Sequence, residues 1–549
     1  MKPSFHHWLL QPRSISMLYL TCILITLAWL YALCGHTFQW MGYHNTAGDL
    51  AQSLSGWYAF ANEPWHFPLL RIQSLDYPIG TNLMQTNGIP LLGLFFKLVH
   101  GILPTGFNYF GLAMLFCYVT QGVAATTLAL SLRQKNLLAT LCFTLFAISA
   151  PILNSRIAGE ESLAFQSLLL FALALYFFNQ HQACSFLKLN VYFGLLLGLS
   201  LLIHPYLTAM CYPFYLIALL KHPLNFKTFK VVLITHALLG LEFFCFGLGA
   251  SYKTQGFGLY NMNLLAPFYG GYFGTGNIDL NPFQEEGFSY LGLGLMALCL
   301  ITVAAFSKKE LHTLLKRHKN LLIVALLFLI YALYGHLGVG KLELINLPTP
   351  KNCFITWDFR SNGRFFWPCF YLLMSFAIGG LIKQAPKAAC IILPLGLIVQ
   401  LWDVSGYFAS TRAHLKTVFS ISNTLQADQA IIHQMQQSTL VIYYPKFDCD
   451  MSYSEYHLLI KTQELAAIAG VPINTAYVAH VNAAVEKPRC GDDSPKYPEH
   501  SPQLLVAEPN HLSPTMRHLL ARHPKQCKLI AGNEYCLEHK PVRENDLSK

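Results

Sequence analysis

The sequence predicts an all-α polytopic transmembrane bundle of about 11–12 spans, followed by a small C-terminal α/β soluble domain. The first observation is composition: of 549 residues, 54% are hydrophobic and 12% are charged, and the mean hydropathy is +0.40. Soluble domains carry about 25% charged residues, so a soluble globular protein is excluded. The second observation is spacing, because the apolar residues form blocks of about 17–25, the length of helix that crosses about 30 Å of hydrocarbon.

The candidate spans begin with 16–36, which follows a short cationic leader. A cleaved signal peptide is the alternative, but Cys34-Gly35-His36 offers no small-x-small cleavage site, and we expect an uncleaved anchor. The segment 88–103 is short and contains Pro90 and Lys97, so we expect it to be re-entrant or to cross only half of the bilayer. The candidate spans are 16–36, 88–103, 107–132, 136–153, 161–178, 189–204, 206–220, 231–250, 288–306, 320–337, 365–382 and 387–403.

Two loops rich in Lys and Arg, 221–230 and 307–319, are expected in the cytoplasm by the positive-inside rule. Counting spans from them, with 88–103 re-entrant, places the N-terminus inside. The same count places 251–287, 338–364 and the tail on the periplasmic side of a bacterial inner membrane. The net charge of +10 is explained by such loops, and no nucleic acid partner is expected, because the cations form no patch interleaved with aromatics.

The predicted domains are a transmembrane domain, 1–404, and a periplasmic domain, 405–549. The second alternates helical stretches with β-like runs, which indicates a small α/β fold. The helical stretches are 410–436 and 453–469, and the β-like runs are 439–444, 475–481 and 503–507.

The tail also contains four cysteines without zinc-type spacing, which favours disulfides in an oxidising compartment. A Gly532-Asn533 turn lies between two short extended stretches, so we expect Cys527 to pair with Cys536 across a hairpin. The remaining pair is then Cys449 with Cys490.

Polar residues gather in the segments assigned to the outer face, where they are costly unless they line a cavity. Asp49 lies at the start of a predicted amphipathic helix, 47–61, which we expect at the membrane interface. A carboxylate there can act as a general base, whereas the simpler interpretation is a solvated residue or a helix cap after Gly48. The full set is Asp49, Arg156, Glu160, Glu161, His204, Glu285, Glu286, Asp358, Arg360 and Arg364.

Arg360 and Arg364 lie at the mouth of a span, where two guanidinium groups can hold a phosphate bidentately. The alternative is ordinary anchoring at the interface, with Asp358 paired to one of them. His204 precedes Pro205 and is more typical of a capping or packing histidine than of a metal ligand. Glu242 lies inside a span, so we expect it to face the bundle interior. No motif requires a cofactor, and no ligand spacing supports a divalent metal.

Several motifs resemble an uncharacterised bacterial membrane family, a domain of unknown function, over about residues 15–404. More broadly, a span, an outer loop with an Asp that leads an interfacial helix, and many further spans resemble the GT-C superfamily of membrane glycosyltransferases, which use polyprenyl-phosphate-linked sugars. The motifs are Gly48-Asp49-Leu50, Gly56-Trp57, Pro64-Trp65, Tyr77-Pro78-Ile79-Gly80-Thr81, Ile89-Pro90-Leu91, Asn261-Met262-Asn263-Leu264-Leu265, Glu286-Gly287-Phe288-Ser289-Tyr290-Leu291-Gly292 and Gly363-Arg364-Phe365-Phe366-Trp367-Pro368.

The resemblance implies a glycosyltransferase on the outer face, with Asp49 as the base for an inverting displacement and a glycan, lipid or protein as acceptor. The polyprenyl-phosphate sugar donor would dock on Arg360 and Arg364, with Asp358, Glu286, Glu160 and His204 near the substrate. The sequence departs from the superfamily's paired acidic motif, because Gly48 and Leu50 flank Asp49. It also has Gly159-Glu160-Glu161 where the closer family tends to have a histidine.

Two other functions stay open. A transporter or flippase of a lipid-linked glycan predicts charges at the bilayer midplane and inverted repeats, and only Glu242 fits. A membrane scaffold for cell-envelope assembly, whose tail recruits partners, leaves Asp49 dispensable.

Overall fold

The computed structural model describes residues 9–44, 46–181, 185–223, 225–248, 256–271, 282–348, 359–420, 425–447, 449, 451–479, 503–507, 526–530 and 533–538. The chain forms two compact units, each built from segments far apart in the sequence. Unit 1 comprises Met1–Phe38, Leu112–Glu242 and Gln255–Thr417, and unit 2 comprises Gln39–Gly111, Phe243–Thr254 and Val418–Lys549. The predicted boundary at residue 404 separates lipid from water, which these contacts do not test.

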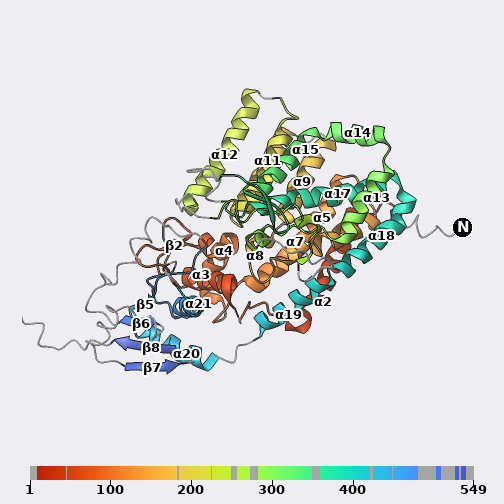
Figure 1. The fold of residues 1–549 in the computed structure, drawn as a ribbon. Coiled ribbons are helices and arrows are strands. Elements are labelled where there is room, and N and C mark those ends of the chain that lie inside the picture. Colours follow the sequence, from red (N-terminus) through yellow and green to blue (C-terminus); the bar gives the residue numbers. More distant parts are fainter. Residues whose placement is uncertain are drawn as a thin grey trace, which may run out of the picture. The chain divides into compact units, whose positions relative to one another are not determined.

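Unit 1 is a bundle of apolar helices, in which α13 packs against α17 and α18 (Figure 1). α11 packs against α9 and α10. The helices that lie wholly or largely in it are α2 (Ile15–Cys34), α5 (Phe110–Ser131), α6 (Leu137–Ile148), α7 (Pro151–Asn154), α8 (Glu161–Ala164), α9 (Ser167–His181), α10 (Phe186–Leu201), α11 (Pro205–Leu219), α12 (Phe226–Phe246), α13 (Leu293–Ala305), α14 (Lys308–Arg317), α15 (Lys319–Leu333), α17 (Trp367–Gln384), α18 (Pro386–Asp403) and α19 (Ser405–Phe419).

Seven helical segments in the described part of the chain are long and apolar enough to cross a membrane, and four shorter apolar helices accompany them. The predicted all-α polytopic fold is therefore confirmed. The segments are Ile15–Thr37, Phe110–Ser131, Leu137–Asn154, Glu161–His181, Phe226–Phe246, Asn362–Gln384 and Pro386–Asp403, and the shorter helices are Phe186–Leu201, Pro205–Leu219, Leu293–Ala305 and Lys319–Leu333.

Some predicted spans are shorter in the structure. The helix in 88–103 is α4 (Pro90–Leu98), whose nine residues extend about 13 Å and cannot cross the hydrocarbon alone. The cationic loop 307–319 contains the helix α14, which begins with a capping box between Ser307 and Glu310. α15 ends at Leu333, and a hairpin of β3 (His336–Val339) and β4 (Leu342–Asn346) follows it.

Unit 2 combines the first long loop with the tail around one core. Its elements are α3 (Gly48–Asn62), β1 (Arg71–Ile72), β2 (Thr81–Asn82), η2 (Leu83–Thr86), α4, η3 (His100–Ile102), α20 (Leu425–Gln436), β5 (Leu440–Tyr444), α21 (Tyr453–Ala469), β6 (Gln503–Ala507), β7 (Gln526–Ile530) and β8 (Asn533–Glu538). The short helix η1 (Gly35–Thr37) precedes this unit and belongs to unit 1. The sheet order is β5-β6-β8-β7, with β5 and β6 parallel and the other pairs antiparallel. The core contains Phe60, Leu70 and Leu83 beside Val441 and Leu459.

The predicted helix 47–61 forms as α3, but protein covers the face that we expected at lipid. Leu50, Leu54 and Trp57 are buried, and the helix packs along α21. The Trp57 indole Nε1 donates a hydrogen bond to the Phe107 carbonyl at 2.9 Å. A helix with an apolar stripe needs an apolar partner, and the tail supplies it within the chain.

In the tail, the helix 453–469 and the strands 439–444 and 503–507 appear within one residue of their predicted ends. The helical stretch 410–436 forms two helices, α19 and α20. The predicted strand 475–481 is wrong over its described residues, 475–479. Side-chain hydrogen bonds replace strand pairing here, because Asn474 Oδ1 accepts from the Tyr443 backbone N–H and Asn474 Nδ2 donates to the Tyr443 carbonyl. The predicted hairpin 527–536 is confirmed as β7–β8, in which Cys527 lies opposite Cys536.

Candidate functional site

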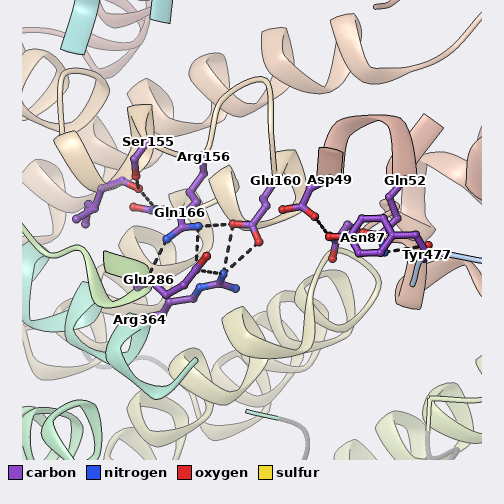
Figure 2. Close-up of polar contacts among 11 residues, drawn as sticks. Asp49, Gln52, Asn87, Ser155, Arg156, Glu160, Gln166, Glu286, Arg364 and Tyr477 are labelled. Atoms are coloured by element: carbon purple, nitrogen blue, oxygen red, sulfur yellow. Dashed lines mark hydrogen bonds and ion pairs between the residues drawn. The ribbon is translucent and has the colours of Figure 1, made fainter. Parts of the chain in front are cut away.

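Asp49 lies in the first turn of α3, where the positive end of the helix dipole favours a carboxylate. Its Oδ1 accepts a hydrogen bond from the phenol hydroxyl of Tyr477 (Figure 2). Tyr477 is itself held by amides, because its backbone N–H donates to Gln463 Oε1 at 2.6 Å and its carbonyl accepts from Gln52 Nε2 at 3.2 Å. The carboxylate is therefore fixed, partly exposed and oriented by a residue of the tail.

Tyr477 stays protonated and therefore donates its hydrogen bond to Asp49 permanently. Burial raises the pKa of Tyr477 well above its usual range, and the negative charge of Asp49 raises it further. The ring contacts Tyr456 and Phe447 edge to face at 5.1 and 5.2 Å between centroids, which fixes the phenol in place. The phenol thus keeps its proton at every pH at which such a protein works.

In unit 1, two arginines and two glutamates form a closed ring of ion pairs, which we call the Arg–Glu cluster: Arg156, Glu160, Glu286 and Arg364 (Figure 2). Arg364 Nη2 lies 3.1 Å from Glu160 Oε1 and 2.7 Å from Glu286 Oε2. Arg156 Nη1 bonds Glu160 Oε2 and lies 3.6 Å from Glu286 Oε2. Each guanidinium therefore touches both carboxylates, and the formal charges of the ring cancel.

In this cluster the neighbouring arginines affect the pKa values of the glutamates more than burial does. Burial alone would raise the pKa of Glu160, but Arg364 and Arg156 outweigh it and lower that pKa to about 2. The pKa of Glu286 is lowered in the same way, since the two arginines oppose burial and the repulsion from Glu160. Both glutamates are therefore ionised at neutral pH.

Glycines bring two of the four charged residues together. A Cβ placed on Gly363 would lie 2.6 Å from the Cα of Gly287 and 2.8 Å from the Met262 nitrogen, so two backbone segments touch there. Glu286 precedes one glycine and Arg364 follows the other, in the 3-10 helices η6 (Pro282–Gly287) and η7 (Asn362–Phe366). The close approach of the two glycines brings the Glu286 carboxylate into contact with the Arg364 guanidinium.

Buried amides hold η6 in place. Gln284 Nε2 donates to Asn261 Oδ1 at 2.8 Å, and Asn263 Nδ2 donates to Gln284 Oε1 at 2.7 Å. Asn261 and Asn263 belong to the motif Asn261-Met262-Asn263-Leu264-Leu265, and both are fully buried. This motif therefore supports the segment that carries Glu286.

The other two charged residues come from the turn between α7 and α8. Glu160 follows Arg156 by four residues, and the turn between them contains Ala158 at φ +58°. His414 Nε2 donates to the Ala158 carbonyl at 2.8 Å, which fixes the turn from α19. The guanidinium of Arg156 also stacks on Trp367, with 5.8 Å from its Cζ to the ring centroid.

Arg360 and Arg364 have different surroundings. Arg360 stacks on Tyr260, with 5.8 Å from its Cζ to the ring centroid, and it pairs with no carboxylate among the described residues. Arg364 is paired twice and stacks on Tyr206 at 5.5 Å. Asp358, which we expected to pair with one of them, lies outside the described residues.

Of the remaining predicted residues, His204 caps α11, where its Nδ1 accepts from the Tyr206 backbone N–H at 3.2 Å. Glu161 is buried, and the side chain of Glu285 lies outside the described part. Glu242 lies against Gly198 of α10. Among the described residues, no three His, Cys, Asp or Glu side chains are grouped to hold a metal ion.

Sequence reasoning missed Tyr477, Tyr206 and Gln284, since nothing in a lone tyrosine or glutamine distinguishes a site residue. It quoted Asn261 and Asn263 within a family motif but gave them no structural role. It found Arg156 as a polar outer residue but assigned it no role. In the tail, Cys449 forms a disulfide, and its predicted partner, Cys490, lies outside the described residues.

The fold defines a polytopic membrane protein of GT-C-like architecture. A mycobacterial arabinofuranosyltransferase, AftD, is similar over 86% of this chain and 34% of its own, at 14% identity and a TM-score of 0.53. ArnT from Cupriavidus metallidurans aligns over 95% of this chain and 97% of its own, at 12% identity and a TM-score of 0.49.

The archaeal oligosaccharyltransferase AglB from Archaeoglobus fulgidus, solved with an inhibitory peptide and a dolichol-phosphate, aligns over 83% of this chain at 13% identity and a TM-score of 0.41. The chain spans 64% of the length of that oligosaccharyltransferase. The chain itself belongs to the DUF6311 family, a domain of unknown function, whose profile matches residues 17–405. No curated protein sequence matches it.

Proposed function

We propose that the protein is a membrane glycosyltransferase that transfers a sugar from a polyprenyl-phosphate donor to an acceptor hydroxyl on the periplasmic face of a bacterial inner membrane. The observation that carries the proposal is Asp49, a partly exposed carboxylate at a helix N-terminus, oriented by Tyr477 in a GT-C-like fold. The disulfide at Cys449 supports the periplasmic assignment of the tail, because disulfides persist in oxidising compartments.

In the proposed reaction, Asp49 takes the proton of the acceptor hydroxyl as its oxygen attacks the anomeric carbon of the donor. The bond from that carbon to the phosphate oxygen breaks, and the polyprenyl phosphate leaves with the electron pair. The attack comes from the side opposite the phosphate, so the anomeric configuration inverts.

The phosphate of the donor is attracted first to a cation that no carboxylate neutralises. Arg360 and Arg364 are the residues that we propose for this role, with Asp358, Glu160, Glu286 and His204 as neighbours of the bound donor. Arg360 pairs with no described carboxylate, whereas Arg364 is neutralised by Glu160 and Glu286. We therefore propose Arg360 as the first contact of the phosphate.

The test uses the full-length protein in nanodiscs with a panel of radiolabelled undecaprenyl-phosphate monosaccharides and the membrane glycans of the source cell as acceptors. Asp49→Asn should fold like the wild type and lose about two orders of magnitude in turnover, the usual contribution of a positioned base. Asp428→Asn is the matched control, because Asp428 lies in the same unit and pairs with Lys461 at 3.0 Å.

Arg360→Lys and Arg364→Lys should raise the KM for the donor, because lysine keeps the charge but loses the planar fork. Wild-type turnover by Asp49→Asn would reject the catalytic assignment, and a scaffold would then explain the protein better. Movement of the labelled lipid across the membrane without transfer would favour the flippase instead.

A further inference from the structure

The four side chains of the Arg–Glu cluster are unequally buried. The exposed fraction is 8% for the side chain of Arg364, 10% for Arg156 and 16% for Glu160, but 43% for Glu286. Glu286 is thus the most exposed of the four and the member that a ligand at the surface reaches first. The other three side chains are mostly buried and form the fixed part of the cluster.

The two arginines keep donors that Glu286 does not satisfy. Arg156 Nε and Arg364 Nε are both buried and have no hydrogen-bond partner. A buried N–H without a partner is destabilising, and more so when the group is charged. A carboxylate has two oxygens, whereas a phosphate ester presents additional oxygens to the same pair of guanidinium groups.

The charges of the cluster also permit a phosphate to replace the Glu286 carboxylate. Arg156 and Arg364 carry two positive charges, and Glu160 neutralises one of them from its buried position. The second charge needs one further anion, which is Glu286 here. A phosphodiester carries one negative charge, so it can take this place without leaving a buried charge uncompensated.

Packing keeps the two guanidinium groups in position without Glu286. Arg364 stacks on Tyr206, and Arg156 stacks on Trp367. Glu160 bonds both of them. A departing Glu286 would therefore leave two oriented forks, which is the geometry that binds phosphate bidentately.

We propose that Arg156 and Arg364 form an anion site that the carboxylate of Glu286 occupies in this structure. A phosphate ester binds there by displacing that carboxylate. The identification of that ester as the donor lipid rests on the proposed glycosyl transfer. The anion site itself does not, because a free phosphate has the same recognition chemistry. Glu286 then selects for ligands whose phosphate competes with a tethered carboxylate.

The experiment measures binding of two probes to the full-length protein in nanodiscs: inorganic pyrophosphate and undecaprenyl phosphate, with undecaprenol as the uncharged control lipid. Glu286→Gln removes the competing charge, so its Kd for the matching probe should fall by about tenfold or more, as expected when a closed state no longer limits binding. Arg156→Lys should raise that Kd by about tenfold. Glu343→Gln is the control, because its exposed fraction, 44%, matches that of Glu286 and it contacts His336 outside the cluster.

A gain with undecaprenyl phosphate assigns the site to a lipid phosphate, and a gain with pyrophosphate alone assigns it to a free phosphate. Unchanged or weaker binding of both probes by Glu286→Gln overturns the proposal and leaves the cluster as a permanent clamp. If Glu286→Gln does not fold, Glu286→Asp provides the same comparison, because the shorter carboxylate competes less and the Kd should still fall. Asp49→Asn should bind the probes like the wild type, so failure of transfer is separable from failure of the anion site.

Discussion

At the scale of single residues, Asp49 is distinguished from other surface carboxylates by the tyrosine that orients it. The phenol of Tyr477 donates a hydrogen bond to Oδ1 of that carboxylate. Tyr456 and Phe447 pack against the same ring and restrict its motion. The oriented carboxylate can serve as a base only if this support stays in place.

Tyr477→Phe removes the hydroxyl and leaves the ring packing intact. We expect turnover to fall by about tenfold while the KM for the donor is unchanged, because the base is displaced but the phosphate contacts are not. The acid limb of the pH–rate profile should move, since the ionised carboxylate loses a hydrogen-bond donor. A proportional loss of folded protein with an unchanged profile would indicate a structural role alone.

Glu160 is the second residue with a pH consequence. Its pKa in the folded protein is lowered to about 2 from an ordinary value of 4.5, so its contribution to stability is full above pH 4.5 and is lost as the pH falls toward 2. We therefore expect the thermal unfolding midpoint of the wild type to drop steeply below pH 4.5.

Glu160→Gln should be less stable than the wild type at pH 6, because it leaves two arginines with one carboxylate, and its midpoint should change less with acid. Thermal unfolding in nanodiscs between pH 6 and 3 measures both effects. Equal acid dependence in the two proteins would show that Glu160 carries no such stabilisation.

At the scale of elements, the site of unit 1 depends on two short 3-10 helices that touch through glycines. η6 and η7 meet at Gly287 and Gly363, and each carries one charged residue beside its glycine. Asn362 Nδ2 in η7 donates to the carbonyls of Tyr331 and Tyr334 at the end of α15, both at 2.8 Å. These contacts fix η7, and with it Arg364, just before the start of α17.

Gly363→Ala tests this contact. The new methyl group would overlap backbone atoms that cannot rotate away, so we expect a loss of about 1–3 kcal/mol or more and a lower unfolding midpoint. Pyrophosphate binding should weaken as well, since Arg364 moves with η7. Gly159→Ala in the neighbouring turn is the control, because its methyl group meets no atom within 4 Å. Equal effects of the two changes would contradict the close contact.

At the scale of the whole molecule, the chain joins a membrane-spanning bundle to a unit made from the first loop and the tail. The core of unit 2 uses Phe60 and Leu83 from the loop and Leu459 from the tail, so neither segment buries its apolar residues alone. The tail is therefore a structural partner of the loop that carries Asp49. Both must lie on the same side of the membrane.

The expected side can be measured with reporter fusions. Alkaline phosphatase fused after residue 410 should be active, because that position is assigned to the periplasm, and a fusion after Arg317 should be inactive. Mass spectrometry of the unreduced protein gives an independent check, since Cys527 and Cys536 face each other in the register of the hairpin. The reverse fusion pattern, with free thiols in the tail, would overturn every assignment of sides.

The sequence by itself determined the features that depend on neighbouring residues. Apolar blocks of span length predicted the helices of unit 1, since hydrophobicity over about 20 residues decides membrane insertion. The Gly532-Asn533 turn predicted the β7–β8 hairpin, and the apolar period of 47–61 predicted α3. It could not predict what covers α3, because a stripe of apolar residues fits lipid and protein equally well.

Only the tertiary structure decided which polar groups meet. Glu160 and Arg364 are 204 residues apart, and Asp49 and Tyr477 are 428 residues apart. No local sequence pattern relates such distant positions. The close contact at Gly363 could not be predicted either, because it is made with backbone atoms, which are the same for every residue type. The sequence showed that charges on the outer segments need partners, since unpaired charges are costly there, and the fold chose the partners.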